Sequence, residues 1–198
     1  PTLYQLFDPS AGNASLTPEK GIIGEAGAEI FSSRSFRARV VGFYRNTKDA
    51  IIYTFNPSSF ASKYLNAGRQ TNYGAELEAN YSAGKVNVIA NYGYTNGKTT
   101  AAYDGTGNPI GKDTTYYNLY HIPKHTINAT VGVQATRSIF YSIALHSVSK
   151  REEFIYGSAP EILKAYFTID LYGEYKFDKK IKIFLDLKNF TGKQYFDI

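Results

Sequence analysis

Three histidines are the first candidates for catalytic or metal-binding chemistry. His121 and His125 are four residues apart, which would align them on a helix, but Pro123 lies between them. In a strand the same spacing leaves the two side chains on one face about 13 Å apart, too far to share a metal ion. Ser142 and His146 repeat that spacing, so they make a poor nucleophile and base pair. We expect structural roles for the histidines, no catalytic residues, no metal and no cofactor.

The stretch 104–111 (DGTGNPIG) matches two ligand-binding motifs in part. As a calcium loop it has Pro109 at the glycine position and Thr115 where a bidentate Glu is needed. As a dinucleotide loop it has Gly105 and Gly107 but lacks the third glycine at the required spacing, and it does not lead from a strand into a helix. Asp-Gly and Asn-Pro both form turns, so we interpret this stretch as the tip of a long loop.

The long link 96–120 is the best candidate for contact with a ligand, because it concentrates aromatic surface and hydrogen-bonding groups. The candidate residues are Tyr103, Asp104, Asp113, Tyr116, Tyr117, Asn118 and Tyr120. The alternative is a solvated loop whose tyrosines only border a membrane.

Composition excludes several classes of protein. The 198 residues contain no Cys, so there is no disulfide, thiol nucleophile or thiolate metal site. The net charge of +5 is modest and its basic residues are spread along the chain, so we expect no nucleic-acid partner. A start at Pro-Thr-Leu without any Met predicts a processed form or a piece of a longer protein. No stretch approaches the roughly 20 apolar residues of a membrane helix.

Apolar residues recur mostly at every second position, and the helical spacing is never sustained. The chain is therefore predicted to be all-β with about eight strands. We place these strands at 22–31, 36–44, 75–81, 86–94, 126–133, 139–146, 168–177 and 181–188.

Short and long connections alternate along the predicted strands. Short turns are expected at 32–35, 82–85, 135–138 and 178–180, and long links at 56–66, 96–120 and 149–163. Because short and long connections then lie at opposite ends, the fold is an antiparallel up-and-down meander.

Two architectures fit such a meander. A soluble barrel or sandwich would bury the apolar faces, with Leu77, Ile143 and Leu185 in its core. An outer-membrane barrel would turn them to lipid and line its lumen with the polar faces. Small residues on the apolar faces, and tyrosines toward the strand ends, favour the membrane barrel. These tyrosines are Tyr44, Tyr53, Tyr73, Tyr81, Tyr92, Tyr94, Tyr166 and Tyr175.

The alternation also assigns side chains to the two faces. Predicted lumen-lining residues are Arg37, Arg39, Glu76, Glu78, Asp170, Glu174 and Asp186. Arg37, Arg39 and Arg45 could steer an anionic ligand, but ion pairs with carboxylates of neighbouring strands are the better interpretation. On the opposite face, Ile143, Leu171, Ile183 and Leu185 are expected to meet lipid.

A series of motifs resembles the barrel of TonB-dependent outer-membrane receptors, in family order. The motifs are 1–7 (PTLYQLF), 12–20 (GNASLTPEK), 25–27 (EAG), 42–53 (GFYRNTKDAIIY), 64–68 (YLNAG), 73–78 (YGAELE), 122–125 (IPKH) and 187–195 (LKNFTGKQY). The run 44–53 most resembles the cobalamin receptor group, with catecholate siderophore receptors close behind.

The resemblance implies a location in the outer membrane of a Gram-negative bacterium and a 22-stranded barrel. Residues 1–198 would be the C-terminal portion of that barrel, without the plug domain or the last strand. The implied function is high-affinity uptake of cobalamin or a ferric siderophore, not an enzymatic reaction. The implied partners are outer-membrane lipid, the TonB complex acting through the plug, and the ligand. The sequence leaves open whether a surface lipoprotein is a further partner.

A second hypothesis is a self-contained small outer-membrane barrel that acts as an adhesin or an enzyme. Closing eight strands would require residues 21–31 to pair with residues 181–190. The sequence offers no convincing catalytic set for it.

Overall fold

The computed structural model describes residues 1–33, 35–56, 58–103, 109–117, 121–153, 161–178 and 180–196. Within these ranges, the side chains of residues 32, 33, 102, 103 and 109–117 are not described. The chain divides into two compact units, one of residues 1–25, 43–73 and 96–119, and one of residues 26–42, 74–95 and 120–198.

One short helix and a series of strands make up the described residues. The helix is α1 (Leu3–Phe7), and the first strands are β1 (Lys20–Ser33), β2 (Phe36–Asn56), β3 (Ala61–Ala83), β4 (Val86–Tyr103) and β5 (Pro109–Tyr117). The remaining strands are β6 (His125–Gln134), β7 (Ile139–Val148), β8 (Arg151–Glu153), β9 (Glu161–Leu163), β10 (Tyr166–Lys176) and β11 (Lys182–Leu187).

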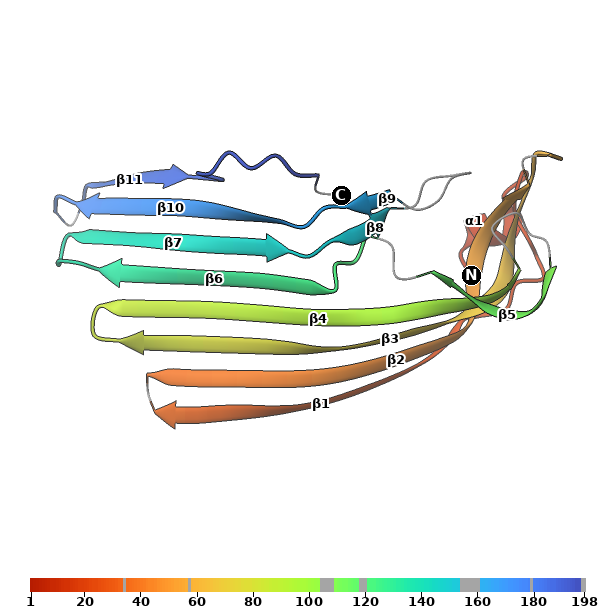
Figure 1. Ribbon diagram of the computed structural model, residues 1–198, viewed down its shortest axis with the longest axis horizontal. Helices are drawn as coiled ribbons and strands as arrows, with labels where there is room; N and C mark the ends of the chain where they lie inside the picture. Colours follow the sequence, from red (N-terminus) through yellow and green to blue (C-terminus); the bar gives the residue numbers. More distant parts are fainter. Residues whose placement is uncertain are drawn as a thin grey trace. The chain divides into compact units, whose positions relative to one another are not determined.

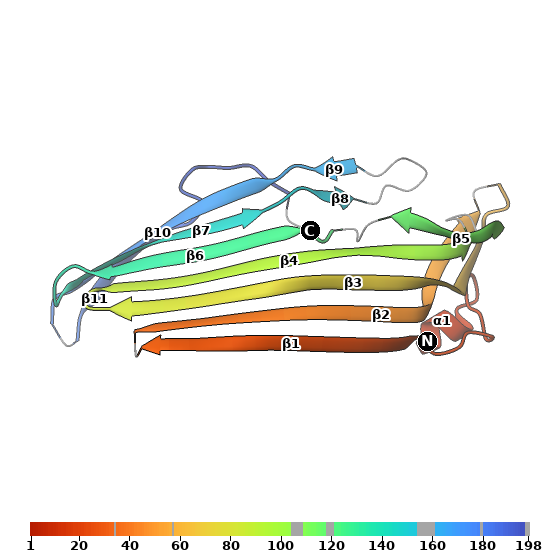
Figure 2. The same cartoon turned by 60° about the horizontal axis from the view of Figure 1, so that its bottom comes forward.

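The main sheet follows the chain order, β1-β2-β3-β4-β6-β7-β10-β11, with β5 paired to β4 (Figures 1 and 2). Each of the eight strands on this path overlaps a predicted strand, although β2, β3 and β4 are much longer than predicted, so the antiparallel meander is confirmed. Among the described residues β1 and β11 end the order and do not pair with each other. The closed eight-stranded barrel of the second hypothesis is therefore not favoured.

The predicted long links contain more regular structure than the sequence indicated. Of the link at 56–66, residues 61–66 already belong to β3, and the Thr54 hydroxyl on β2 donates to the carbonyl of Lys63 at 3.0 Å. The link at 96–120 is largely the extended pair β4–β5, rich in β-branched and aromatic residues that favour strands. The link at 149–163 contains the pair β8–β9.

Helix α1 was not predicted from the sequence. Its N-terminus is a capping box, in which the Thr2 hydroxyl accepts from the Gln5 N–H and the Gln5 side chain accepts from the Thr2 N–H. No helix among the described residues is long and apolar enough to cross a membrane.

The described residues do not form a conventional hydrophobic core. The buried apolar residues among them are mostly small: Ala11, Leu16, Ala50, Ala67, Ala101, Val148 and Tyr166. Leu77, Ile143 and Leu185 are instead 45%, 46% and 61% exposed. The soluble interpretation, which required these three residues to be buried, is therefore wrong.

Candidate functional site

The candidate functional surface is a sheet with two chemically different faces. In an antiparallel pair, directly opposed residues lie on the same face, so the strand register identifies each face. One row across β4, β6, β7, β10 and β11 consists of Val88, Val131, Ile143, Leu171 and Leu187. The row beside it consists of Val86, Val133, Tyr141, Gly173 and Leu185. These rows form a continuous apolar face.

This apolar face is open over most of its area. Ile143, Ile183 and Leu185 are all exposed, as predicted, while Leu171 is half-buried between its neighbours. A soluble monomer rarely exposes an apolar patch of more than a few hundred Å², and larger patches mark interaction surfaces. An uncovered row of apolar residues on five adjacent strands is suited to contact with lipid.

The opposite face carries linked charged groups. The Lys188 ammonium lies 3.3 Å from carboxylate oxygens of both Asp170 and Asp186, on β10 and β11. Asp170 also accepts the backbone N–H of Asn189 at 2.7 Å. The structure thus brings together two predicted lumen-lining carboxylates through a lysine that the sequence analysis did not single out.

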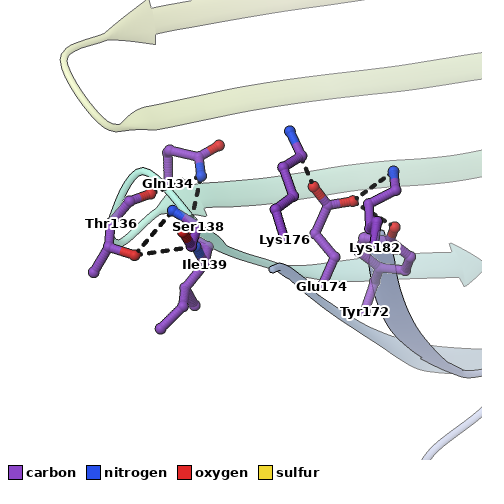
Figure 3. A network of polar contacts seen from close by, with 8 residues as sticks. All are labelled: Gln134, Thr136, Ser138, Ile139, Tyr172, Glu174, Lys176 and Lys182. Atoms are coloured by element: carbon purple, nitrogen blue, oxygen red, sulfur yellow. Dashed lines mark hydrogen bonds and ion pairs between the residues drawn. The ribbon is translucent and has the colours of Figure 1, made fainter. Parts of the chain in front are cut away.

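Glu174 is the centre of a second network on the polar face (Figure 3). Its carboxylate accepts the Tyr172 hydroxyl at 2.8 Å and lies 3.1 Å from the Lys182 ammonium and 3.7 Å from the Lys176 ammonium. The Glu174 side chain is only 11% exposed. Its charge is therefore compensated by groups on β10 and β11 themselves.

The predicted ion pairing of strand arginines is confirmed at one position. Arg37 on β2 pairs with Glu29 on β1, and its guanidinium also lies over the Phe31 ring, 5.7 Å from the centroid. Within the described part of the chain, no ion pair involves the other residues considered for such pairing. These are Arg39, Arg45, Glu25, Glu76 and Glu78. That the seven polar residues line a lumen stays a prediction.

Two of the predicted short turns, at 135–138 and 178–180, are stabilised by hydrogen bonds to their own side chains. The Thr136 hydroxyl accepts the backbone N–H groups of Ser138 and Ile139 at 3.2 and 3.1 Å (Figure 3). Asp178 accepts two backbone N–H groups in the β10–β11 turn, and Gly84 adopts φ +58° in the β3–β4 turn. Such a conformation favours glycine.

The three histidines lie apart, each with a different partner. His125 Nδ1 lies 2.8 Å from the Tyr92 hydroxyl, and His146 Nδ1 lies 2.6 Å from Asn128 Oδ1. His121 Nε2 lies 3.3 Å from a Glu153 carboxylate oxygen. The described residues hold no group of three or more metal-ligating side chains.

The predicted tyrosine girdle needs one correction. Tyr44, Tyr53, Tyr73, Tyr81 and Tyr175 are exposed, and Tyr92 and Tyr94 are half-buried.

Tyr166, in contrast, is only 5% exposed and shares the polar face with Thr168, which opposes His146. The Tyr195 ring stacks on the Tyr166 ring with 4.3 Å between the ring centroids. The Arg151 guanidinium lies over the Tyr166 ring, 5.8 Å from its centroid. Tyr166 therefore fills a packed cluster and cannot belong to a girdle.

This cluster borders a cavity of about 280 Å³ between residues 161–166 and 193–196. No signal in the sequence predicts this cavity, because the residues that form it are about 30 positions apart and belong to no common motif.

The side chains of all seven predicted ligand-facing residues lie outside the described residues. The backbone of Tyr103, Asp113, Tyr116 and Tyr117 belongs to β4 and β5, whereas Asp104, Asn118 and Tyr120 are not described at all. Their role as a ligand-facing segment stays a prediction.

Comparison with known families decides what this two-faced sheet is. Residues 1–190 match the family model described as TonB dependent receptor-like, beta-barrel. The chain belongs to the TonB-dependent receptor family. Its sheet is part of the β-barrel of such a receptor, and its location is the outer membrane of a Gram-negative bacterium. A search of curated proteins found no match.

Solved structures share the fold at low sequence identity. The FrpB iron transporter from Neisseria meningitidis (F3-3 variant) is 17% identical with a TM-score of 0.70, over 94% of this chain and 29% of that chain. The copper transporter OprC is 18% identical with a TM-score of 0.74, over 99% and 30%. The ferric-catecholate import receptor Fiu from K12 E. coli is 16% identical with a TM-score of 0.72, over 98% and 26%. The chain thus spans less than a third of each of these structures.

Proposed function

We propose that this chain is part of the wall of a receptor that imports a large, scarce nutrient across the outer membrane. The observation that carries the proposal is the sheet with one open apolar face and one charge-paired polar face, in a chain of this family. The apolar face meets lipid and the polar face lines the barrel lumen. No covalent bond is made or broken, so the protein is not an enzyme. The TonB complex supplies the energy through a plug domain outside residues 1–198.

The proposed nutrient is cobalamin or, as the alternative, a ferric siderophore. The resemblance of the run 44–53 to cobalamin receptors supports the first. The structural neighbours named as iron transporter and ferric-catecholate receptor support the second, although at this identity they share only the fold. A surface lipoprotein that covers the receptor is a further partner in this proposal.

Uptake by whole cells tests the function. Cells that express the full-length receptor are given labelled cobalamin or labelled ferric catecholate, with and without functional TonB. The proposal predicts uptake of one of these ligands that stops when TonB is removed. Uptake that continues without TonB, or uptake of neither ligand, would contradict it.

The ligand-facing segment has a separate test. Replacing both Tyr116 and Tyr117 with Ala should weaken ligand binding to cells by at least about tenfold, because each aromatic contact contributes roughly 1 kcal/mol. Tyr141→Ala is the matched control, because Tyr141 is an exposed tyrosine on the apolar face. Equal losses in the two variants would mean that the segment has no special role in binding.

A further inference from the structure

The turn end of the sheet carries an excess of positive charge. Three cations lie in or beside the turns of adjacent hairpins: Lys85 between β3 and β4, Arg137 between β6 and β7, and Lys180 between β10 and β11. All three are exposed. The hairpins that carry them belong to one compact unit at these turns, so the cations share one end of the same sheet.

The carboxylates at this end are already occupied. Glu174 binds Lys176 and Lys182, and Asp178 accepts the backbone N–H groups of its own turn at 2.7 and 2.9 Å. With Lys85, Arg137 and Lys180 added, the described residues at the turns of these three hairpins include five cations against two carboxylates.

Lys85, Arg137 and Lys180 keep a positive charge that can attract an anionic partner. Within the described residues, no ion pair involves Arg137 or Lys180. The Lys85 ammonium donates to the carbonyl of Ala135 at 2.8 Å, which holds it over the neighbouring turn. A hydrogen bond to a neutral carbonyl leaves that positive charge uncompensated.

The apolar face continues to the same end. Tyr175 and Phe177 are 44% and 61% exposed, with their rings edge to face at 4.7 Å, and Ile181 is 55% exposed. A surface that passes from aliphatic side chains through aromatic rings to cations matches the passage from acyl chains to headgroups at a membrane surface.

We propose that the turn end binds anionic phospholipid headgroups, with Lys85, Arg137 and Lys180 as the phosphate contacts. The short turns of outer-membrane barrels lie on the periplasmic side, where the leaflet consists of phospholipid. The site continues the membrane interface and does not depend on which nutrient the receptor imports. Arg137 offers a planar fork of N–H donors that matches phosphate oxygens, and the lysines add point charges.

Native mass spectrometry of the purified full-length receptor tests this site. The delipidated receptor is titrated with phosphatidylglycerol or phosphatidylethanolamine of identical acyl chains, and bound lipid is counted. We expect retention of phosphatidylglycerol to be at least about fivefold greater, since one cation near an anionic surface contributes about that factor. In the triple variant Lys85→Gln, Arg137→Gln and Lys180→Gln the two lipids should bind about equally. Higher salt should reduce the preference of the wild-type receptor.

A second triple variant separates the site from net charge. Lys63→Gln, Lys124→Gln and Lys150→Gln also removes three exposed charges, but from positions away from the short turns. This control should keep the preference for phosphatidylglycerol. Equal binding of the two lipids by the wild-type receptor would overturn the proposal, as would an equal loss in both variants or an unchanged preference in the turn-end variant. Heat-modifiable gel migration confirms that each variant is folded.

Discussion

Replacing Ile143 with Arg should lower the free energy of unfolding much more if this face of the sheet meets lipid than if it meets water. Ile143 lies on a central strand, is 46% exposed and is flanked by Leu171 and Val131 on the same face. If this face meets lipid near the bilayer midplane, Arg should lower the free energy of unfolding by about 2–4 kcal/mol. If it met water, the same exposed substitution should change it by only about 0.5 kcal/mol.

Ala144→Arg is the matched control for this prediction. Ala144 is the next residue on β7 and lies on the polar face, opposite Asp170 and Thr130. An arginine there would lie beside a carboxylate on the face proposed to line the lumen, so its cost should stay near 0–1 kcal/mol. The free energies come from urea titrations of the full-length receptor in phospholipid vesicles, followed by heat-modifiable gel migration. A small cost at Ile143, or a cost at Ala144 as large as at Ile143, would refute the assignment of the faces.

Three further predictions concern the turns and the N-terminus. Gly84→Ala should cost about 1–2 kcal/mol in the same titration because its φ is positive, whereas Gly173→Ala, which also has open space for a methyl group, should cost less than about 1 kcal/mol. Thr136→Ala should lower the free energy of unfolding by about 1 kcal/mol, and Thr136→Ser should restore it, because the hydroxyl caps two backbone N–H groups. The Ser10 hydroxyl, assisted by the backbone N–H groups of Ala11 and Ser10 and opposed by desolvation, holds the pKa of Asp8 below its ordinary value. The N-terminal turn should therefore be fully formed above the ordinary pKa of Asp and loosen as pH falls through the lowered pKa of Asp8. An NMR titration of Asp8 should show a higher titration midpoint in Ser10→Ala.

The period-two pattern predicted the strands well because each residue on one face of this sheet meets the same medium. In β7, Ile139, Tyr141, Ile143 and Leu145 alternate with residues of the polar face, and the register to β6 and β10 keeps this division. The division of the sheet into an apolar and a polar face also followed from the sequence, since charged residues alternate with apolar ones.

Strand ends were predicted less well. Beyond Asn96 the chain becomes rich in Thr, Tyr and Gly, so the alternation of apolar and polar residues disappears although β4 continues to Tyr103 and β5 follows. Hydropathy reports only what a side chain faces, and it loses its signal where both faces of a strand are polar.

The charge networks depended on register. Lys182, Asp186 and Lys188 share a face by alternation, but only the pairing of β11 with β10 brings them to Glu174 and Asp170. Tyr166 shows the same limit, because Tyr195 reaches it from a segment without sequence periodicity. Contacts between distant segments do not follow from a local pattern.

Spin labels along β7 test most directly the claim that one face of this sheet lies in lipid and the other in water. The chain contains no Cys, so single cysteines at successive positions 139–148 can be labelled in the full-length receptor once any cysteines outside this chain are replaced. In bilayers, oxygen should reach labels at Ile139, Tyr141, Ile143 and Leu145 best, and a water-soluble nickel complex should reach the alternate positions. Accessibility without a period of two, or with oxygen and nickel exchanged, would contradict the account.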